Sequence, residues 1–97
     1  MHLLFVLVGG PRTESALTVQ ELGAAGLDAG HRVSVFCAGD GTAHLDTVAA
    51  LRQAGATVMF CSADAAARGW DRPGAPGRGS FVDLATMAAD ADRMVVL

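Results

Sequence analysis

The sequence predicts an α/β fold, a flavodoxin-like three-layer sandwich around a mainly parallel sheet of four or five strands. Four short apolar blocks alternate with stretches whose apolar spacing suits helices; the blocks are residues 3–8, 33–37, 57–61 and 94–97. Apart from Ser34 and Thr57, the blocks are continuously apolar, which is typical of strands buried on both faces of a parallel sheet. We therefore expect helices on both faces and the strand order 2-1-3-4. The 97 residues suffice for one domain, residues 1–97.

Hydroxyl residues and glycines mark where the helices should begin and end. The candidate N-caps are Thr13, Thr42, Ser62 and Ser80. The helices should end near residues 29, 52, 68 and 89, with Gly30, Gly55 and Gly69 just beyond the first three. The one long connection, residues 70–80, contains two prolines and three glycines. It suits a lid or partner-binding segment as well as it suits a plain connection.

Composition excludes several classes of protein. With 52% apolar and 18% charged residues, the chain is too apolar to be disordered. A net charge of −3 argues against a nucleic-acid binder, and the absence of lysine excludes a Walker A loop and a Schiff-base lysine. Two cysteines and three histidines without ligand spacing predict no metal site. No apolar run is long enough to cross a membrane, so we expect a cytoplasmic protein with reduced thiols.

Both cysteines are the last residues of predicted strands. Ligands of open parallel sheets bind at the carboxyl ends of the strands, where Cys37 and Cys61 should lie. Cys61 also precedes a helix, whose free N–H groups and dipole favour a reactive thiolate, although Asp64 in the first turn opposes it. We predict Cys61 as the reactive residue, with its sulfur open to solvent or to a partner. The alternative is a small buried side chain without chemistry.

Cys37 is a candidate second thiol but is expected mainly to pack in the core. In the order 2-1-3, strand 1 separates the two cysteines by about 9–10 Å. A disulfide requires Cα atoms within about 7 Å. A redox pair between Cys37 and Cys61 is therefore disfavoured.

The glycine-containing turns at the same edge offer backbone amides to a small anion. The candidate binding residues are Gly10, Asp40, Gly41 and Ser62. The Gly39-Asp40-Gly41 turn lacks the third glycine of a dinucleotide fingerprint, because position 44 is histidine, and we expect no cofactor. His44 could transfer a proton or could be an inert surface residue, and no Ser/His/Asp triad can be assembled from the sequence.

Taken together, these segments resemble the DsrE/DsrF-like family, which includes the sulfur-relay proteins of TusBCD type. The similar segments are residues 8–11 and 13–15, 29–36, 39–41, 60–63, 68–69 and 91–96, and in this order they cover essentially the whole chain. The resemblance implies a flavodoxin-like sandwich that assembles into dimers, trimers or hexamers. It also implies a persulfide-carrying cysteine at the end of the third strand, eight residues before the glycine of an Arg-Gly pair. Cys61 and Gly69 match that spacing, whereas the short chain and the Pro/Gly-rich segment 70–80 depart from the pattern.

Three hypotheses about function follow. The first is a cytoplasmic persulfide carrier of sulfurtransferase type that uses Cys61 and exchanges sulfur with donor and acceptor proteins. The second is a non-catalytic, oligomeric binding module that holds a small anion or a partner protein at the strand edge. The third, weaker one is a thiol peroxidase or redox sensor, for which Cys37 is poorly placed as the resolving thiol.

Overall fold

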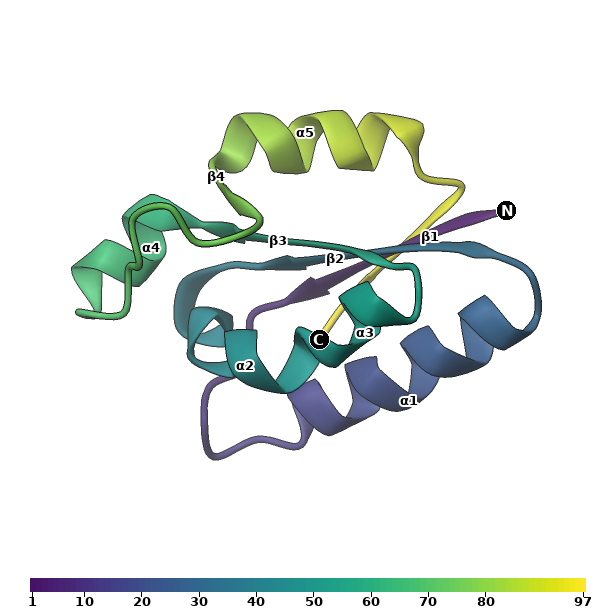
Figure 1. Ribbon diagram of the computed structural model, residues 1–97, viewed down its shortest axis with the longest axis horizontal. Coiled ribbons are helices and arrows are strands. Elements are labelled where there is room, and N and C mark those ends of the chain that lie inside the picture. The colour runs from purple at the N-terminus through teal and green to yellow at the C-terminus, as the bar shows by residue number, and fades with distance from the viewer.

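A computed structural model describes residues 1–97 as a five-stranded, all-parallel sheet with helices on both faces (Figure 1). The strands are β1 (His2–Leu7), β2 (Arg32–Cys37), β3 (Thr57–Cys61), β4 (Arg78–Gly79) and β5 (Arg93–Val96). The helices are α1 (Ser15–Asp28), α2 (Leu45–Val48), α3 (Ala50–Gln53), α4 (Ser62–Ala67), α5 (Phe81–Asp90) and the 3-10 helix η1 (Gly39–His44). No helix is both long and apolar enough to span a membrane. The α/β class, the parallel sheet and the four main strands are as predicted.

The predicted strand order 2-1-3-4 is wrong. The observed order is β4-β3-β2-β1-β5, so β2 separates β1 from β3, and β5 pairs with the other edge of β1. In Figure 1, α1, α2 and α3 lie on one face of the sheet and α5 lies on the other. Because parallel crossovers are almost always right-handed, helices on one face move the chain in one direction across the sheet. The crossover through α5, on the other face, therefore returns the chain to the β1 side.

Glycines end three helices as the sequence predicts. Gly30 has a φ of +84°, which lets its N–H reach the carbonyl of Leu27 while the N–H of His31 reaches that of Gly26. This Schellman pattern satisfies carbonyls that the end of α1 would otherwise leave unpaired. The same pair of hydrogen bonds closes α3 at Gly55 and α4 at Gly69. Local sequence is enough to set these ends, because a positive φ strains every residue except glycine.

Only one of the four predicted N-caps is correct. Ser80 caps α5 in a capping box with Asp83. Helix α1 begins only at Ser15, because the hydroxyl of Thr13 serves the preceding turn and donates to the carbonyl of Gly10. Thr42 lies inside η1 and donates to the carbonyl of Gly39, and the single helix expected over this segment is divided into η1, α2 and α3. Helix α4 is capped by Cys61 rather than by Ser62.

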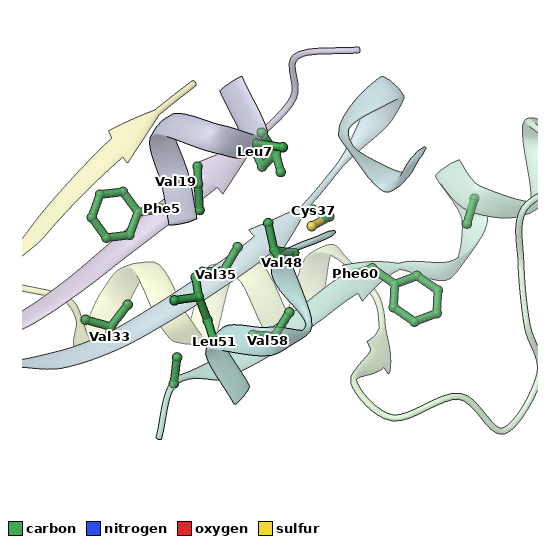
Figure 2. Packing of buried hydrophobic residues seen from close by; sticks show 13 residues of the cluster. Phe5, Leu7, Val19, Val33, Val35, Cys37, Val48, Leu51, Val58 and Phe60 are labelled. Atoms are coloured by element: carbon green, nitrogen blue, oxygen red, sulfur yellow. The ribbon is translucent and has the colours of Figure 1, made fainter. Parts of the chain in front are cut away.

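The core has two clusters, one on each face of the sheet. Thirteen buried residues, Cys37 among them, fill the space between the sheet and α1, α2 and α3 (Figure 2). Six buried residues, Cys61 among them, lie on the face covered by α5. The expected burial of the last strand is wrong, because Met94, Val95 and Val96 are 41–57% exposed. Strand β5 is an edge strand, paired only with β1.

The cap of α5 can be tested by substitution. Ser80→Ala removes the oxygen that accepts from the N–H of Val82, and we expect it to lower the free energy of unfolding by about 1 kcal/mol. Thr86→Ala, at an exposed position of the same helix, serves as the matched control. Urea unfolding of the two variants measures the difference. Equal stabilities would show that the capping box does not hold α5.

Candidate functional site at the carboxyl edge of the sheet

The carboxyl ends of the strands bring together most of the residues that the sequence singled out. Gly10 follows β1 and lies against Asp40 of η1, where a Cβ placed on Gly10 would be 3.3 Å from that of Asp40. Arg68, just after α4, donates to the Asp40 carboxylate at 2.8 Å. His44 Nε2 lies 2.9 Å from the carbonyl oxygen of Gly10. The loop after β1, helix η1 and the end of α4 therefore meet in one polar network.

Gly41 allows η1 to pack closely against the end of β1, because it has no side chain. A Cβ on Gly41 would lie 1.9 Å from the carbonyl oxygen of Leu7, so η1 packs directly onto the backbone at the end of β1. The N–H of Gly41 already donates to the carbonyl of Ala38 at 2.9 Å. Among the candidate binding residues, Gly41 is thus a point of close backbone approach whose amide is engaged within the protein.

The Cys61 sulfur combines burial with one polar contact. As the N-cap of α4, its Sγ accepts a hydrogen bond from the N–H of Asp64 at 3.4 Å. The residue is only 1% exposed and shares an apolar cluster with Val6, Phe36 and Met87. The prediction of an open sulfur is therefore wrong for this structure, because α5 covers the face of the sheet on which the side chain lies. The predicted contact with a helix N–H is present.

Asp64 makes structural contacts that the sequence did not predict. Its carboxylate accepts a hydrogen bond from the N–H of Gly39 at 2.7 Å. Its carbonyl accepts from the guanidinium of Arg68 at 3.0 Å. Asp64 thus connects α4 to η1. Ser62, expected as the cap, is instead the half-buried first residue of α4.

Cys37 and Cys61 are kept apart by orientation, and the separation by strand 1 predicted from the sequence is wrong. Strands β2 and β3 are neighbours, and Cys37 pairs in register with Phe60 rather than with Cys61. Because successive side chains of a strand point to opposite faces, the two cysteines enter opposite core clusters. Burial raises the pKa of the Cys37 thiol to about 12, an effect that the charge of Arg52 partly offsets.

One polar cluster at the opposite, amino end of the strands was not found from the sequence. His2 Nε2 lies 2.7 Å from Ser34 Oγ, and His2 Nδ1 lies 3.2 Å from an Asp90 carboxylate oxygen without hydrogen-bond geometry. His2 and Ser34 are 5% and 2% exposed, so the Ser34 hydroxyl is closed to substrates. Arg32 binds the same carboxylate at 2.6 Å. The cluster fastens the end of α5 to the sheet, and the polar residues within otherwise apolar strands were its only signal.

Ion pairs hold the segment 70–80 against the body of the protein. Arg78 pairs with Asp71 within the segment, and Arg72 makes two hydrogen bonds to Asp46 of α2, at 3.0 and 3.2 Å. These contacts keep the pKa values of Asp46 and Asp71 below their ordinary range. Arg52 donates to the carbonyls of Val58 and Pro76. In this structure the segment therefore contacts α2 through Arg72 and is linked to β3 through Arg52.

This segment also encloses one side of a pocket of about 240 Å³. Its other walls come from the loop after β1 and from η1 and α2. The lining includes Pro11, Thr42, Leu45, Asp46, Trp70 and Arg72. None of the predicted site residues, Gly10, Cys37, Asp40, Gly41, Cys61 and Ser62, lines this pocket, and Trp70 was not among them.

The burial of Cys37 predicts a loss of stability at alkaline pH. A thiol whose pKa is higher in the folded state stabilises the fold below the pKa of the unfolded thiol, and this contribution disappears as the pH rises toward the folded pKa. We expect the free energy of unfolding to fall between about pH 8.5, the usual thiol value, and pH 12. The chain has neither lysine nor tyrosine, so few other groups titrate in this range. Urea unfolding at pH 8, 9.5 and 11 should show a smaller decrease for Cys37→Ala, and equal decreases would contradict the assignment.

The close approach at Gly41 gives a second test. Gly41→Ala should lower the free energy of unfolding by about 3 kcal/mol, since the new methyl group overlaps the carbonyl of Leu7. Gly10→Ala is the graded control, because its methyl group would meet Asp40 at 3.3 Å and can be accommodated by a small shift. The urea midpoints of both variants measure the difference. An equal loss in the two variants would argue against a tight contact between η1 and β1.

Comparison with known proteins identifies the fold. No protein-family model and no curated protein sequence matches the chain. Among solved structures, the crystal structure of the YchN protein from E. coli superposes with a TM-score of 0.79 at 18% sequence identity, over 100% of both chains. At this identity the likeness concerns the fold alone. The chain thus has the α/β fold of YchN along its whole length.

Proposed function

We propose that this chain is a sulfur carrier that holds sulfane sulfur as a persulfide on Cys61. The observation that carries the proposal is the hydrogen bond from the N–H of Asp64 to Cys61 Sγ at the start of α4. An N–H directed at the sulfur and the positive end of a helix both stabilise negative charge on it. The DsrE/DsrF-like resemblance, in which Cys61 occupies the position of the sulfur-carrying residue, supports the same role.

The reaction needs no reagent beyond the donor and the acceptor. The Cys61 thiolate attacks the outer sulfur of a donor persulfide, so a bond forms between Cys61 Sγ and that sulfur while the donor S–S bond breaks. The donor leaves as a thiolate, and the transferred sulfur keeps its proton. Attack by an acceptor thiolate on the outer sulfur of the Cys61 persulfide then repeats the same exchange and regenerates the Cys61 thiolate.

In this proposal the 1% exposure of Cys61 makes transfer depend on an opening step. Helix α4 is six residues long and is fastened to η1 by the Asp64–Gly39 hydrogen bond and the Arg68–Asp40 ion pair. These contacts hold the N–H of Asp64 against the sulfur. A docking donor protein that displaces α5 would uncover the sulfur and leave this hydrogen bond in place.

We also propose that the chain assembles with copies of itself, as a dimer, trimer or hexamer. The supporting observation is the number of large apolar side chains that a single copy leaves exposed. They include Met94 and Val96 of β5 and Phe81 and Val82 of α5, at 54–75% exposure. Apolar surface of this kind is typical of protein–protein contacts.

Intact-mass measurement tests the sulfur-carrier proposal. After incubation with glutathione persulfide we expect a gain of one sulfur atom in the wild type and in Cys37→Ala, because the Cys37 thiol is buried and protonated. Cys61→Ser should show no gain, since a hydroxyl cannot form a persulfide. A wild-type protein that stays unmodified, or an adduct that remains in Cys61→Ser, would refute the proposal.

The burial of Cys61 specifically favours a second candidate, the non-catalytic binding module. In that case the thiol only packs, and the carboxyl edge binds a small molecule or a partner. The pH dependence of iodoacetamide alkylation of Cys61 separates the two functions. A midpoint at or above about 8.5, the value of a free thiol, supports the binding module, and a clearly lower midpoint supports the carrier.

A further inference from the structure

The sheet has an uncovered apolar strip beside α5. Leu4 and Val6 of β1 belong to the core cluster under α5 and are 0% and 6% exposed. Their partners in register on β5, Met94 and Val96, are 54% and 57% exposed. Residues paired in register on neighbouring strands place their side chains on the same face of the sheet. The cover that α5 provides therefore ends between β1 and β5.

One helix is too narrow to cover this face of the sheet. Strands lie about 4.8 Å apart and a helix with its side chains is about 10 Å wide, so a single helix covers about two strands. The sheet has five strands, and α5 lies alone on its face, whereas α1, α2 and α3 cover the other (Figure 1). The strip over β5 is thus the place where a second helix would lie beside α5.

Helix α5 has two flanks of different character, one on each side of its core-facing residues. The polar flank consists of Asp83, Thr86 and Asp90, and the apolar flank consists of Phe81, Val82, Ala85 and Ala89. Asp83 lies against Gly79 of β4, and Asp90 binds Arg32 of β2. The polar flank is therefore on the side away from β5. Because the two flanks lie on opposite sides of the helix, the apolar flank faces the uncovered strip.

The strip and the apolar flank together form one uncharged notch, which we call the α5 notch. Its members are Met94 and Val96 on β5 and Phe81, Val82, Ala85 and Ala89 on α5. The four large side chains are 54–75% exposed and offer roughly 400 Å² of surface, which is most of the apolar share of the about 800 Å² that each partner buries in a stable dimer. The two alanines leave room for another helix to approach closely.

A second copy of this chain supplies both surfaces that the notch requires. The strip needs an uncharged helix flank to cover it, and the apolar flank of α5 needs an apolar surface to lie on. A two-fold interface satisfies both needs at once, since each copy places its α5 on the strip of the other. We propose that two copies pair through the α5 notch, so that their α5 helices form one shared layer between two sheets. This inference rests on the self-assembly proposed above and identifies the surface that makes it.

Charge introduced on either wall of the notch tests the pairing. Ala85→Glu alters the apolar flank at an exposed position, and Met94→Glu alters the strip. Each should raise the dissociation constant of the assembly at least about tenfold, because a carboxylate would be buried without a partner. Thr86→Glu, the adjacent position on the polar flank, is the matched control and should assemble as the wild type does. Sedimentation velocity over an about hundredfold range of protein concentration measures the association, and urea midpoints check that each variant is folded.

The outcomes separate this inference from the other proposals. A wild-type protein that stays monomeric would overturn the α5 notch and the proposed self-assembly together. An Ala85→Glu variant that assembles as the wild type does would overturn the notch alone. Loss of assembly in Met94→Glu only would then show that the copies join along the edge of β5. Cys61→Ser should assemble normally, so the result is independent of the sulfur-carrier test.

Discussion

The placement of α5 on the face opposite α1, α2 and α3 constrains the rest of the molecule. Since parallel crossovers are right-handed, the three helices on one face carry the chain from β1 through β2 to β3. The crossover through α5 then brings it back to pair β5 with β1. This path makes β2 and β3 neighbours and covers the Cys61 side of the sheet. The accessibility of the candidate thiol therefore depends on where one helix lies.

The two thiols differ because their surroundings differ. Cys37 lies within an apolar cluster of thirteen residues, where a thiolate would be desolvated, and burial accordingly raises its pKa. Cys61 is equally buried, but it lies at the junction of β3 and α4, where an amide hydrogen faces the sulfur. The burial of Cys61 and the N–H contact at its sulfur are compatible with the proposed sulfur transfer if a docking partner first exposes the sulfur.

The polar contacts at the two ends of the sheet differ in burial. At the amino ends, the buried residues His2 and Ser34 and the exposed carboxylate of Asp90 form a cluster that fastens α5. At the carboxyl ends, the polar contacts of Asp40, Asp64 and Arg68 lie partly at the surface, and a pocket opens beside them. The carboxyl edge is thus where contacts can be exchanged without exposing the larger core cluster, in keeping with the general position of ligand sites in open parallel sheets.

The sequence by itself determined the α/β class, the four main strands, the glycine ends of three helices and the cap at Ser80. These features follow from local patterns, namely continuous apolar blocks, a positive φ at glycine and a serine followed by Asp83. Only the tertiary structure decided the strand order, the burial of Cys61, the exposure of β5 and the pocket at Trp70. The physical reason is that the residues of an apolar strand do not specify which strands lie beside it. Which strands pair, and which face a helix covers, depends on contacts between segments far apart in the chain.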